Sequence, residues 1–265
     1  MPARTIGQKV IHYEQAGRGT PLVLLHGYPL DARIWSAQRE ALSDQFQVIT
    51  PDLPGFGESK SSDPFTIQSL ADDVHALLQA LGATQCVLGG LSMGGYVALA
   101  YARKYLPELR ALVLIDTRAE GDSPQGKEAR MKAIETARTQ GSREIASQML
   151  PKMLAPGAQN ARPELAKQLM TIMESCPALT IEHALLAMRD RADQTAELPS
   201  LALPTLILVG DGDAITPPSV AESMQRAIPS AQLTIIHGAG HMTPMEQPDQ
   251  VNRAMRMFLQ TLAAG

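Results

Sequence analysis

Short apolar runs alternate with longer amphipathic stretches along most of this chain of 265 residues, and this alternation restricts its fold more than any other feature. Runs that are apolar throughout are typical of parallel strands that are buried on both faces of a sheet. The helical stretches between the runs supply the crossovers that parallel strands require. The alternation therefore predicts an α/β fold, with strands at Val10–Tyr13, Leu22–Leu25, Val48–Thr50, Cys86–Leu91, Ala111–Ile115, Thr205–Val209 and Leu233–Ile236.

The segment from Thr66 to Leu81 shows the helical pattern most clearly. Its apolar residues recur at intervals of three and four, and Gly82 follows at a position where helices commonly end. The next apolar run begins at Cys86, so only a short loop joins this helix to a strand. We therefore expect helices that pack against a mostly parallel sheet.

The alternation stops between Thr117 and Pro199. This segment contains several helical stretches but no convincing strand, and prolines and glycines divide it into short pieces. We interpret it as a helical cap at residues 117–199, inserted into a single domain whose core comprises residues 1–116 and 200–265. The helices expected in the cap include Lys127–Gln140, Arg143–Leu150 and Pro163–Glu174.

Composition and charge narrow the range of partners. The net charge is -4 and no cluster of Lys and Arg with interleaved aromatic residues occurs, which argues against nucleic acid as a partner. No apolar run approaches the roughly 18 residues that span a bilayer, and residues 1–10 contain no signal-peptide core, so we expect a cytoplasmic protein without a membrane partner. Cys86 and Cys176 are then expected to be reduced structural thiols. A small molecule is the expected partner, and the sequence does not determine the oligomeric state.

A Gly-x-Ser-x-Gly pattern spans Gly90 to Gly94, between an apolar run and a helical stretch. In a sharp strand-to-helix turn of this kind, the glycines let strand and helix approach each other while the serine occupies a strained position. The hydroxyl of Ser92 would then lie at a helix N-terminus, where backbone N–H groups stabilise developing negative charge. This context predicts that Ser92 is a nucleophile.

A serine hydroxyl needs a base within hydrogen-bond reach, and a histidine held by a carboxylate is the usual base. His241 lies in a glycine-rich loop directly after the last expected strand, which would bring it to the same edge of the sheet as Ser92. His237 is nearer the strand and less free to reach the serine. We therefore expect His241 to be the general base, and ordinary core or surface positions for His12, His75 and His183.

The carboxylate that orients the histidine should follow a strand that lies between the serine and the histidine in the chain. The run Thr205–Gly210 leads directly into Asp211, Gly212 and Asp213. Asp213 is the preferred candidate, because Asp followed by Gly is itself a turn signal and gives Asp211 a simple structural role. Asp116 stays open as a further rival, since it ends the strand that comes after the serine.

Two backbone N–H groups are expected to stabilise an oxyanion. One belongs to Met93, directly after the expected nucleophile, and the other to Tyr28, in the loop that follows the strand Leu22–Leu25. His26 in the same loop is expected to brace it and not to act in catalysis. No His-Glu-x-x-His or paired Cys-x-x-Cys pattern occurs, so no metal site is expected.

Five motifs resemble those of the α/β-hydrolase family, and they occur in the family's order of serine, aspartate and histidine. They are His26–Pro29, Asp52–Ser59, Gly90–Gly95, Val209–Asp213 and Gly240–His241. Within the family the chain is most similar to bacterial carboxylesterases and to 3-oxoadipate enol-lactonase-like hydrolases. The resemblance implies a mostly parallel sheet of about eight strands, no cofactor, and ester hydrolysis through an acyl-serine intermediate.

The same family hosts other chemistries, and some of them do not fit this sequence. Haloalkane dehalogenases and epoxide hydrolases attack with an aspartate at the position of Ser92, and the cap lacks the tyrosines that epoxide hydrolases use. Three alternatives stay open: an enol-lactonase, a cofactor-free perhydrolase that shares the three residues, and a receptor-like protein with little turnover.

The cap is rich in flexible side chains that suit an adaptable apolar pocket, although such residues at helical spacing usually pack a cap onto its core. These residues are Met131, Met149, Leu150, Met153, Met170, Met173 and Met188. Trp35 and Met242 are the expected apolar substrate contacts near the serine, which favours uncharged esters of short to medium chain. An enol-lactonase would need a cation for a substrate carboxylate, and Arg189 or Arg191 could supply it.

Overall fold

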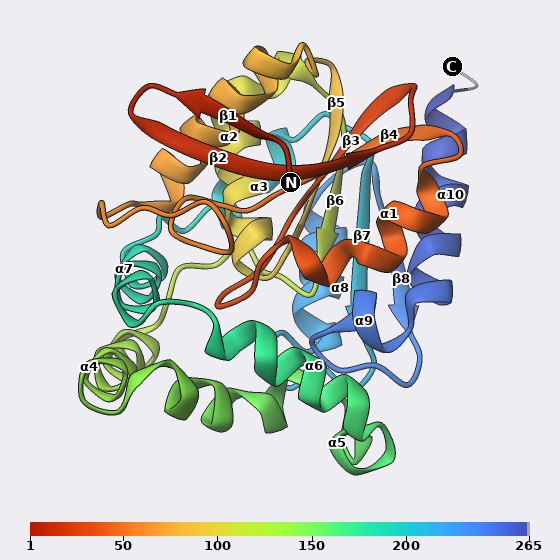
Figure 1. Cartoon of the computed structure of the whole chain (residues 1–265). Coiled ribbons are helices and arrows are strands. Elements are labelled where there is room, and N and C mark those ends of the chain that lie inside the picture. Colours follow the sequence, from red (N-terminus) through yellow and green to blue (C-terminus); the bar gives the residue numbers. More distant parts are fainter. Residues whose placement is uncertain (264–265) are drawn as a thin grey trace.

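The computed structural model describes residues 1–263 and contains one sheet of eight strands, in the order β1-β2-β4-β3-β5-β6-β7-β8 (Figure 1). β2 pairs antiparallel with β1 and β4, and all other neighbours are parallel. The strands are β1 (Ala3–Ile6), β2 (Lys9–Ala16), β3 (Thr20–Leu25), β4 (Phe46–Pro51), β5 (Cys86–Leu91), β6 (Leu109–Ile115), β7 (Thr205–Gly210) and β8 (Ala231–Ile236). The expected α/β class and the mostly parallel sheet of eight strands are confirmed.

All seven strands expected from the sequence are present, and β1 is the one that the sequence did not reveal. It pairs only with β2 at the edge of the sheet, and each of its four residues keeps some exposed surface. An edge strand of this kind has no apolar run by which to recognise it. His12 therefore lies in the second strand and not in the first.

The strands bury side chains on both faces of the sheet. Val23 and Leu25 of β3 belong to one hydrophobic cluster, while Leu22 and Leu24 belong to a second cluster on the opposite face. The first cluster includes residues of α2 (Ile67–Leu81), α3 (Met93–Tyr105) and α8 (Pro218–Ala227), and the second includes residues of α1 (Ser36–Leu42) and α10 (Pro248–Ala263). This two-sided burial explains why the central strands are apolar throughout.

The helix α2 begins and ends where the sequence predicts. The side chain of Thr66 accepts a hydrogen bond from the Ser69 N–H at 3.0 Å, and the Thr66 N–H donates to the Ser69 hydroxyl at 2.9 Å. At the other end Gly82 has a φ of 63°, a conformation that favours glycine.

Four α-helices lie between β6 and β7 in sequence, and they are grouped beyond the carboxyl ends of the strands (Figure 1). We call α4 to α7 the inserted helices. α4 is interrupted at Gly141, where φ is 81° and ψ is -177°, so it forms the two helical stretches that the sequence predicts. The four helices are α4 (Pro124–Met153), α5 (Ala158–Ala161), α6 (Pro163–Glu174) and α7 (Ala178–Arg189).

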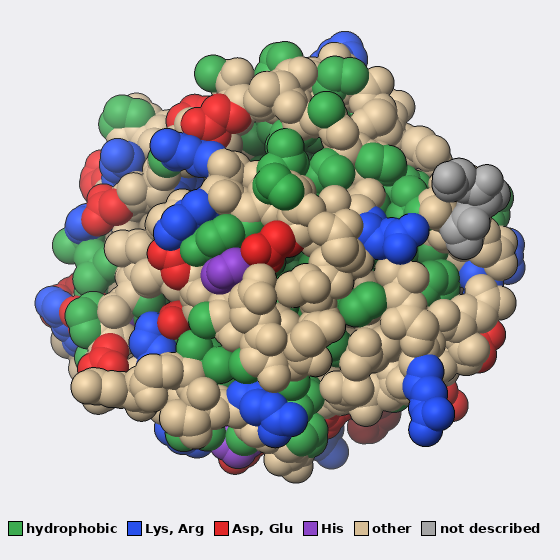
Figure 2. All heavy atoms as spheres, turned by 90° about the horizontal axis from the view of Figure 1, so that it is seen from above, with side chains coloured by type: hydrophobic (Ala, Val, Ile, Leu, Met, Phe, Trp, Pro, Cys, Tyr) green, Lys and Arg blue, Asp and Glu red, His purple; other side chains and the backbone are tan. Residues whose placement is uncertain are grey.

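The face of the molecule opposite the inserted helices carries charges of both signs. Figure 2 shows acidic and basic side chains interspersed with hydrophobic and neutral ones, so this face has no continuous basic surface. Within residues 1–263, no helix has both the length and the apolar character that a membrane crossing demands.

Both cysteines are buried and unpaired, as the sequence predicts. Burial raises the pKa of the Cys86 thiol to about 12 and also raises that of Cys176, so both sulfurs stay protonated at neutral pH.

Candidate active site

Ser92 lies in a sharp turn between β5 and α3. Its φ of 53° and ψ of -112° are a strained conformation for a residue with a side chain. Two glycines permit the turn: a Cβ on Gly90 would lie 2.2 Å from the carbonyl carbon of Gly94, and one on Gly94 would lie 2.3 Å from Leu25 O. Between residues 86 and 102 Ser92 alone is not buried, so the turn leaves this residue partly exposed.

The loop after β3 packs against Ser92. A Cβ on Gly27 would lie 3.2 Å from the Cβ of Ser92, so the backbone that continues into Tyr28 lies beside the serine. Met93 is the first residue of α3, and its N–H therefore has no acceptor within the helix. The two backbone segments that carry the expected oxyanion donors thus lie beside Ser92.

His26 holds this loop in place. Its Nδ1 lies 2.8 Å from the Gly27 carbonyl oxygen, and its Nε2 accepts a hydrogen bond from the Leu53 N–H at 3.0 Å. Burial lowers the pKa of the imidazole, although the nearby Asp52 acts in the opposite direction. A neutral His26 that uses both ring nitrogens braces two loops, which is the role that the sequence predicts.

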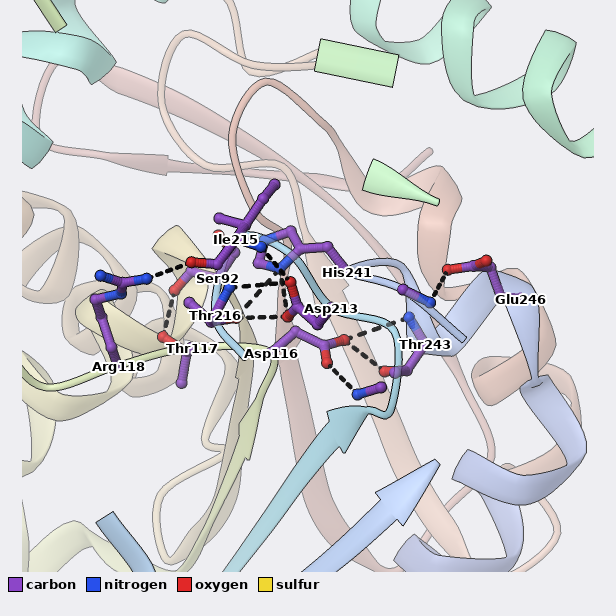
Figure 3. Close-up of polar contacts among 12 residues, drawn as sticks. Ser92, Asp116, Thr117, Arg118, Asp213, Ile215, Thr216, His241, Thr243 and Glu246 are labelled. Atoms are coloured by element: carbon purple, nitrogen blue, oxygen red, sulfur yellow. Dashed lines mark hydrogen bonds and ion pairs between the residues drawn. The ribbon is translucent and has the colours of Figure 1, made fainter. Parts of the chain in front are cut away.

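Asp213 and His241 lie side by side, although 27 residues separate them in the chain. The Nδ1 of His241 is 2.8 Å from Oδ2 of Asp213, and both side chains are buried (Figure 3). They come from the loops after β7 and β8, which end at the same edge of the sheet as β5. The sheet thus brings Ser92, Asp213 and His241 to one edge.

The carboxylate of Asp213 accepts three further hydrogen bonds. The N–H groups of Ile215 and Thr216 donate to Oδ1 at 2.7 and 2.9 Å, and the Thr216 hydroxyl donates to Oδ2 at 2.6 Å. Burial alone would raise the pKa of Asp213, but the bonds from His241 and Thr216 outweigh it and hold that pKa below its usual value. Asp213 is therefore ionised at neutral pH and can hold an imidazole Nδ1–H.

Asp116 and Asp211, the rival carboxylates, make no hydrogen bond to His241. Asp116 accepts hydrogen bonds from the Gly210 N–H at 3.0 Å and from the Thr243 hydroxyl at 2.6 Å. The Oδ2 of Asp211 instead lies 3.2 Å from Nδ1 of the exposed His237 imidazole. Among residues 1–263 no group of three or more acidic, histidine or cysteine side chains could hold a metal ion.

Two residues that contact this site were not foreseen from the sequence. The Thr216 hydroxyl lies 3.3 Å from His241 Nδ1 in addition to its bond with Asp213. A hydroxyl residue three positions after an aspartate in a turn is a local signal that could have identified Thr216. Glu246 accepts a bond from the Gly240 N–H at 2.7 Å, but no local pattern marks this contact.

Trp35 and Met242, the expected substrate contacts, are both fully buried. They belong to the same hydrophobic cluster as Leu150, Met153 and Leu154 at the end of α4. Several methionines of the inserted helices also pack into the two clusters, as residues at helical spacing usually do, whereas Met131 is exposed. The buried ones are Met153, Met173 and Met188.

Arg189 and Arg191 are already engaged with acidic partners. The guanidinium of Arg189 donates to Asp190 at 2.8 Å. That of Arg191 is only 3% exposed; it donates to Asp122 at 2.6 Å and to the Met188 carbonyl at 2.7 Å. It also lies 4.3 Å from the centre of the Tyr96 ring. Neither cation is left free at the end of α7.

Comparison with known proteins agrees with this geometry. The family model described as the alpha/beta hydrolase fold matches residues 20–248. The chain belongs to the α/β-hydrolase family. The resemblance seen in the sequence is thereby confirmed, as is the family's fold.

Relatives within the α/β-hydrolase family include several hydrolases. A thermophilic esterase from Thermogutta terrifontis, solved with malate bound, is 45% identical with a TM-score of 0.94, over 98% of this chain and 96% of the esterase. The enol-lactonase from Burkholderia xenovorans LB400 is 25% identical with a TM-score of 0.91, and the match covers 98% of this chain and 100% of the enol-lactonase. A pimeloyl-[acyl-carrier protein] methyl ester esterase of Nitrosomonas europaea is 29% identical, and the match covers 91% of this chain and 96% of that esterase. These relatives support a hydrolase that acts on small molecules.

Proposed function

We propose that this protein hydrolyses carboxylic esters of small, uncharged substrates through an acyl-serine intermediate. The observation that carries the proposal is the strained Ser92 at the start of α3, at the same sheet edge as the buried pair of Asp213 and His241. This combination provides a nucleophile, a base, and a carboxylate that orients the base. The esterases among its relatives support the same reaction class.

In the proposed reaction, His241 accepts the proton of the Ser92 hydroxyl through Nε2 as the oxygen attacks the ester carbonyl. The N–H groups of Tyr28 and Met93 stabilise the oxyanion, and His241 then returns the proton to the departing alcohol. Water, activated by the same imidazole, attacks the acyl-serine and releases the acid. Throughout, the ionised Asp213 holds Nδ1–H and stabilises the imidazolium. No step requires a cofactor.

The substrate is proposed to be uncharged because the cations at the end of α7 are occupied. An enol-lactonase substrate carries a carboxylate, which needs a free cation. The paired state of Arg189 and the burial of Arg191 against Asp122 argue against that alternative. Trp35 and Met242 stay predicted apolar substrate contacts, and in this structure both side chains are fully packed against their own cluster.

Turnover of p-nitrophenyl butyrate by the native protein and by Ser92→Ala tests the proposal. Without the nucleophile, kcat should fall by about 10⁴-fold or more, while folding, followed by circular dichroism, stays native. Absence of turnover in the native protein would refute the proposal and favour a receptor-like protein, and equal turnover in both proteins would refute Ser92 as the nucleophile.

A further inference from the structure

The carboxylate of Glu246 joins two segments that are far apart in the chain. Its Oε1 accepts a hydrogen bond from the Gly240 N–H at 2.7 Å, and its Oε2 accepts one from the Ala155 N–H at 2.8 Å. Gly240 directly precedes His241, whereas Ala155 follows the end of α4. Glu246 is only 3% exposed, so water does not compete for either bond. One buried side chain therefore links the segment after α4 to the backbone beside His241. Figure 3 shows Glu246 on the His241 side of this link.

Glu246 is itself fixed relative to His241. It ends the short helix α9 (Thr243–Glu246), which begins two residues after His241. The Glu246 N–H donates to the Met242 carbonyl at 2.8 Å, and the side chain then folds back onto Gly240. The backbone on both sides of His241 is thus closed into a small ring that passes through the carboxylate.

The inserted segment at Ala155 lies in tight contact with the loops that hold His241 and Asp213. A Cβ on Gly240 would lie 2.5 Å from Ala155 N, so only glycine fits there. A Cβ on Gly212, next to Asp213, would lie 3.0 Å from the Pro156 ring. A shift of this segment would therefore be transmitted to both residues.

Burial disfavours the charged form of the Glu246 carboxylate, and backbone N–H groups favour it. Burial raises the pKa of Glu246, and the N–H groups of Ala155 and Gly240 oppose that shift because they favour the charged form. Arg162 on the inserted side donates to the backbone carbonyl of Glu246 and not to its carboxylate. The two N–H groups are the largest contributions that favour the charged form, and the Met242 N–H and the charge of Arg162 add to them.

We propose that Glu246 is a positioning residue that ties the inserted helices to the backbone beside His241 and so sets the alignment of His241 with Ser92. The proposal rests on the proposed role of His241 as the base. It implies that contacts between a substrate and the inserted helices influence the base through this carboxylate.

The test compares Glu246→Gln with Glu108→Gln. The amide of Gln turns an N–H toward one of the two backbone N–H groups, so one bond is lost while the shape is kept. Glu108 is a matched control, because its carboxylate accepts hydrogen bonds from His75, Tyr101 and Gln79 but precedes β6, at the opposite edge of the sheet. Both variants should lose thermal stability.

Only Glu246→Gln should affect the site. Its kcat for p-nitrophenyl butyrate should fall about 10- to 100-fold, as a small misplacement of a base does, with KM within about twofold of the native value. The low-field proton resonance of the bond between His241 Nδ1 and Asp213 should shift or broaden in Glu246→Gln and stay at its native position in Glu108→Gln. This resonance is observable without turnover, so it tests Glu246 even if the proposed esterase activity is absent.

A second variant keeps the test decisive if Glu246→Gln does not fold. Glu246→Asp keeps the charge but is one methylene too short to reach both N–H groups, so it should reproduce the loss of kcat and the change in the resonance. A native kcat and a native resonance in either folded variant, with only the melting temperature reduced, would overturn the proposal and leave Glu246 as a purely structural residue.

Discussion

Asp116 and Asp213 follow neighbouring strands and are both buried, yet only Asp213 contacts the histidine. Asp116 comes directly after β6, and its N–H still donates to the Leu208 carbonyl of β7 at 2.9 Å. Its side chain therefore stays at the level of the sheet, where it accepts bonds from Gly210 and Thr243.

The loop at Asp213 is longer, and this length decides which carboxylate reaches the imidazole. Asp213 lies three residues beyond the end of β7, and its N–H donates to the Gly210 carbonyl at 3.2 Å, which closes a turn. The two intervening residues carry it above the sheet edge to the height of His241. Two similar strand ends can thus place one carboxylate beside a histidine and the other in a structural clamp.

The largest expected effect is a loss of kcat that distinguishes Asp213 from Asp116. Asp213→Asn should lower kcat by about 10⁴-fold, because the amide no longer fixes the histidine tautomer or stabilises the imidazolium. Asp116→Asn should lose far less, since Asp116 acts only through Thr243 and Gly210. Steady-state kinetics with p-nitrophenyl butyrate measures both losses.

Circular dichroism is the control for folding in this pair. If Asp116→Asn loses as much activity as Asp213→Asn while both remain folded, the assignment of Asp213 as the one orienting carboxylate is wrong.

A smaller effect is expected at Thr216, whose hydroxyl donates to Asp213 Oδ2. Thr216→Val keeps the shape and removes a hydrogen bond to a charged group, which should lower kcat about tenfold. Thr180→Val is a matched control, because the Thr180 hydroxyl is also buried but donates to the Gly55 carbonyl, away from His241. Equal kcat values for Thr216→Val and the native protein would show that the hydrogen bond from Thr216 to Asp213 does not contribute to turnover.

The fold was largely predictable because its central strands are buried on both faces. Seven apolar runs identified seven strands, while β1 escaped because an exposed edge strand has no apolar run. Gly82 identified the end of α2, since a left-handed residue there favours glycine.

The geometry of the candidate site was predictable where a local constraint exists and not where a contact depends on distant segments. Ser92 could be identified because its turn requires Gly90 and Gly94. The bond between Glu246 and Ala155 could not, because it spans 91 residues and depends on how the inserted helices pack. The substrate contacts of Trp35 and Met242 stay predictions, since both residues are buried in a shared cluster.

The smallest expected effect concerns stability and not catalysis. Burial, and after it the charge of Asp213, raises the pKa of Asp116 well above its usual value, although bonds from Thr243 and Gly210 oppose the shift. The folded protein therefore favours protonated Asp116. This contribution to stability is fully present below the pKa of an unfolded aspartate, about 4, and is lost as the pH rises through the folded pKa.

Asp116→Asn cannot ionise, so its free energy of unfolding relative to the native protein should increase with pH. The increase should approach about 1.4 kcal/mol for each pH unit in which Asp116 is ionised when unfolded and protonated when folded. Urea unfolding of both proteins between about pH 5 and pH 8 measures this difference, in which the titration of most other groups cancels. A difference that does not change with pH would mean that Asp116 ionises equally well in the folded and unfolded states. In that case burial after β6 would not raise the pKa of Asp116, and the contrast with Asp213 would rest on loop length and not on a disfavoured charge.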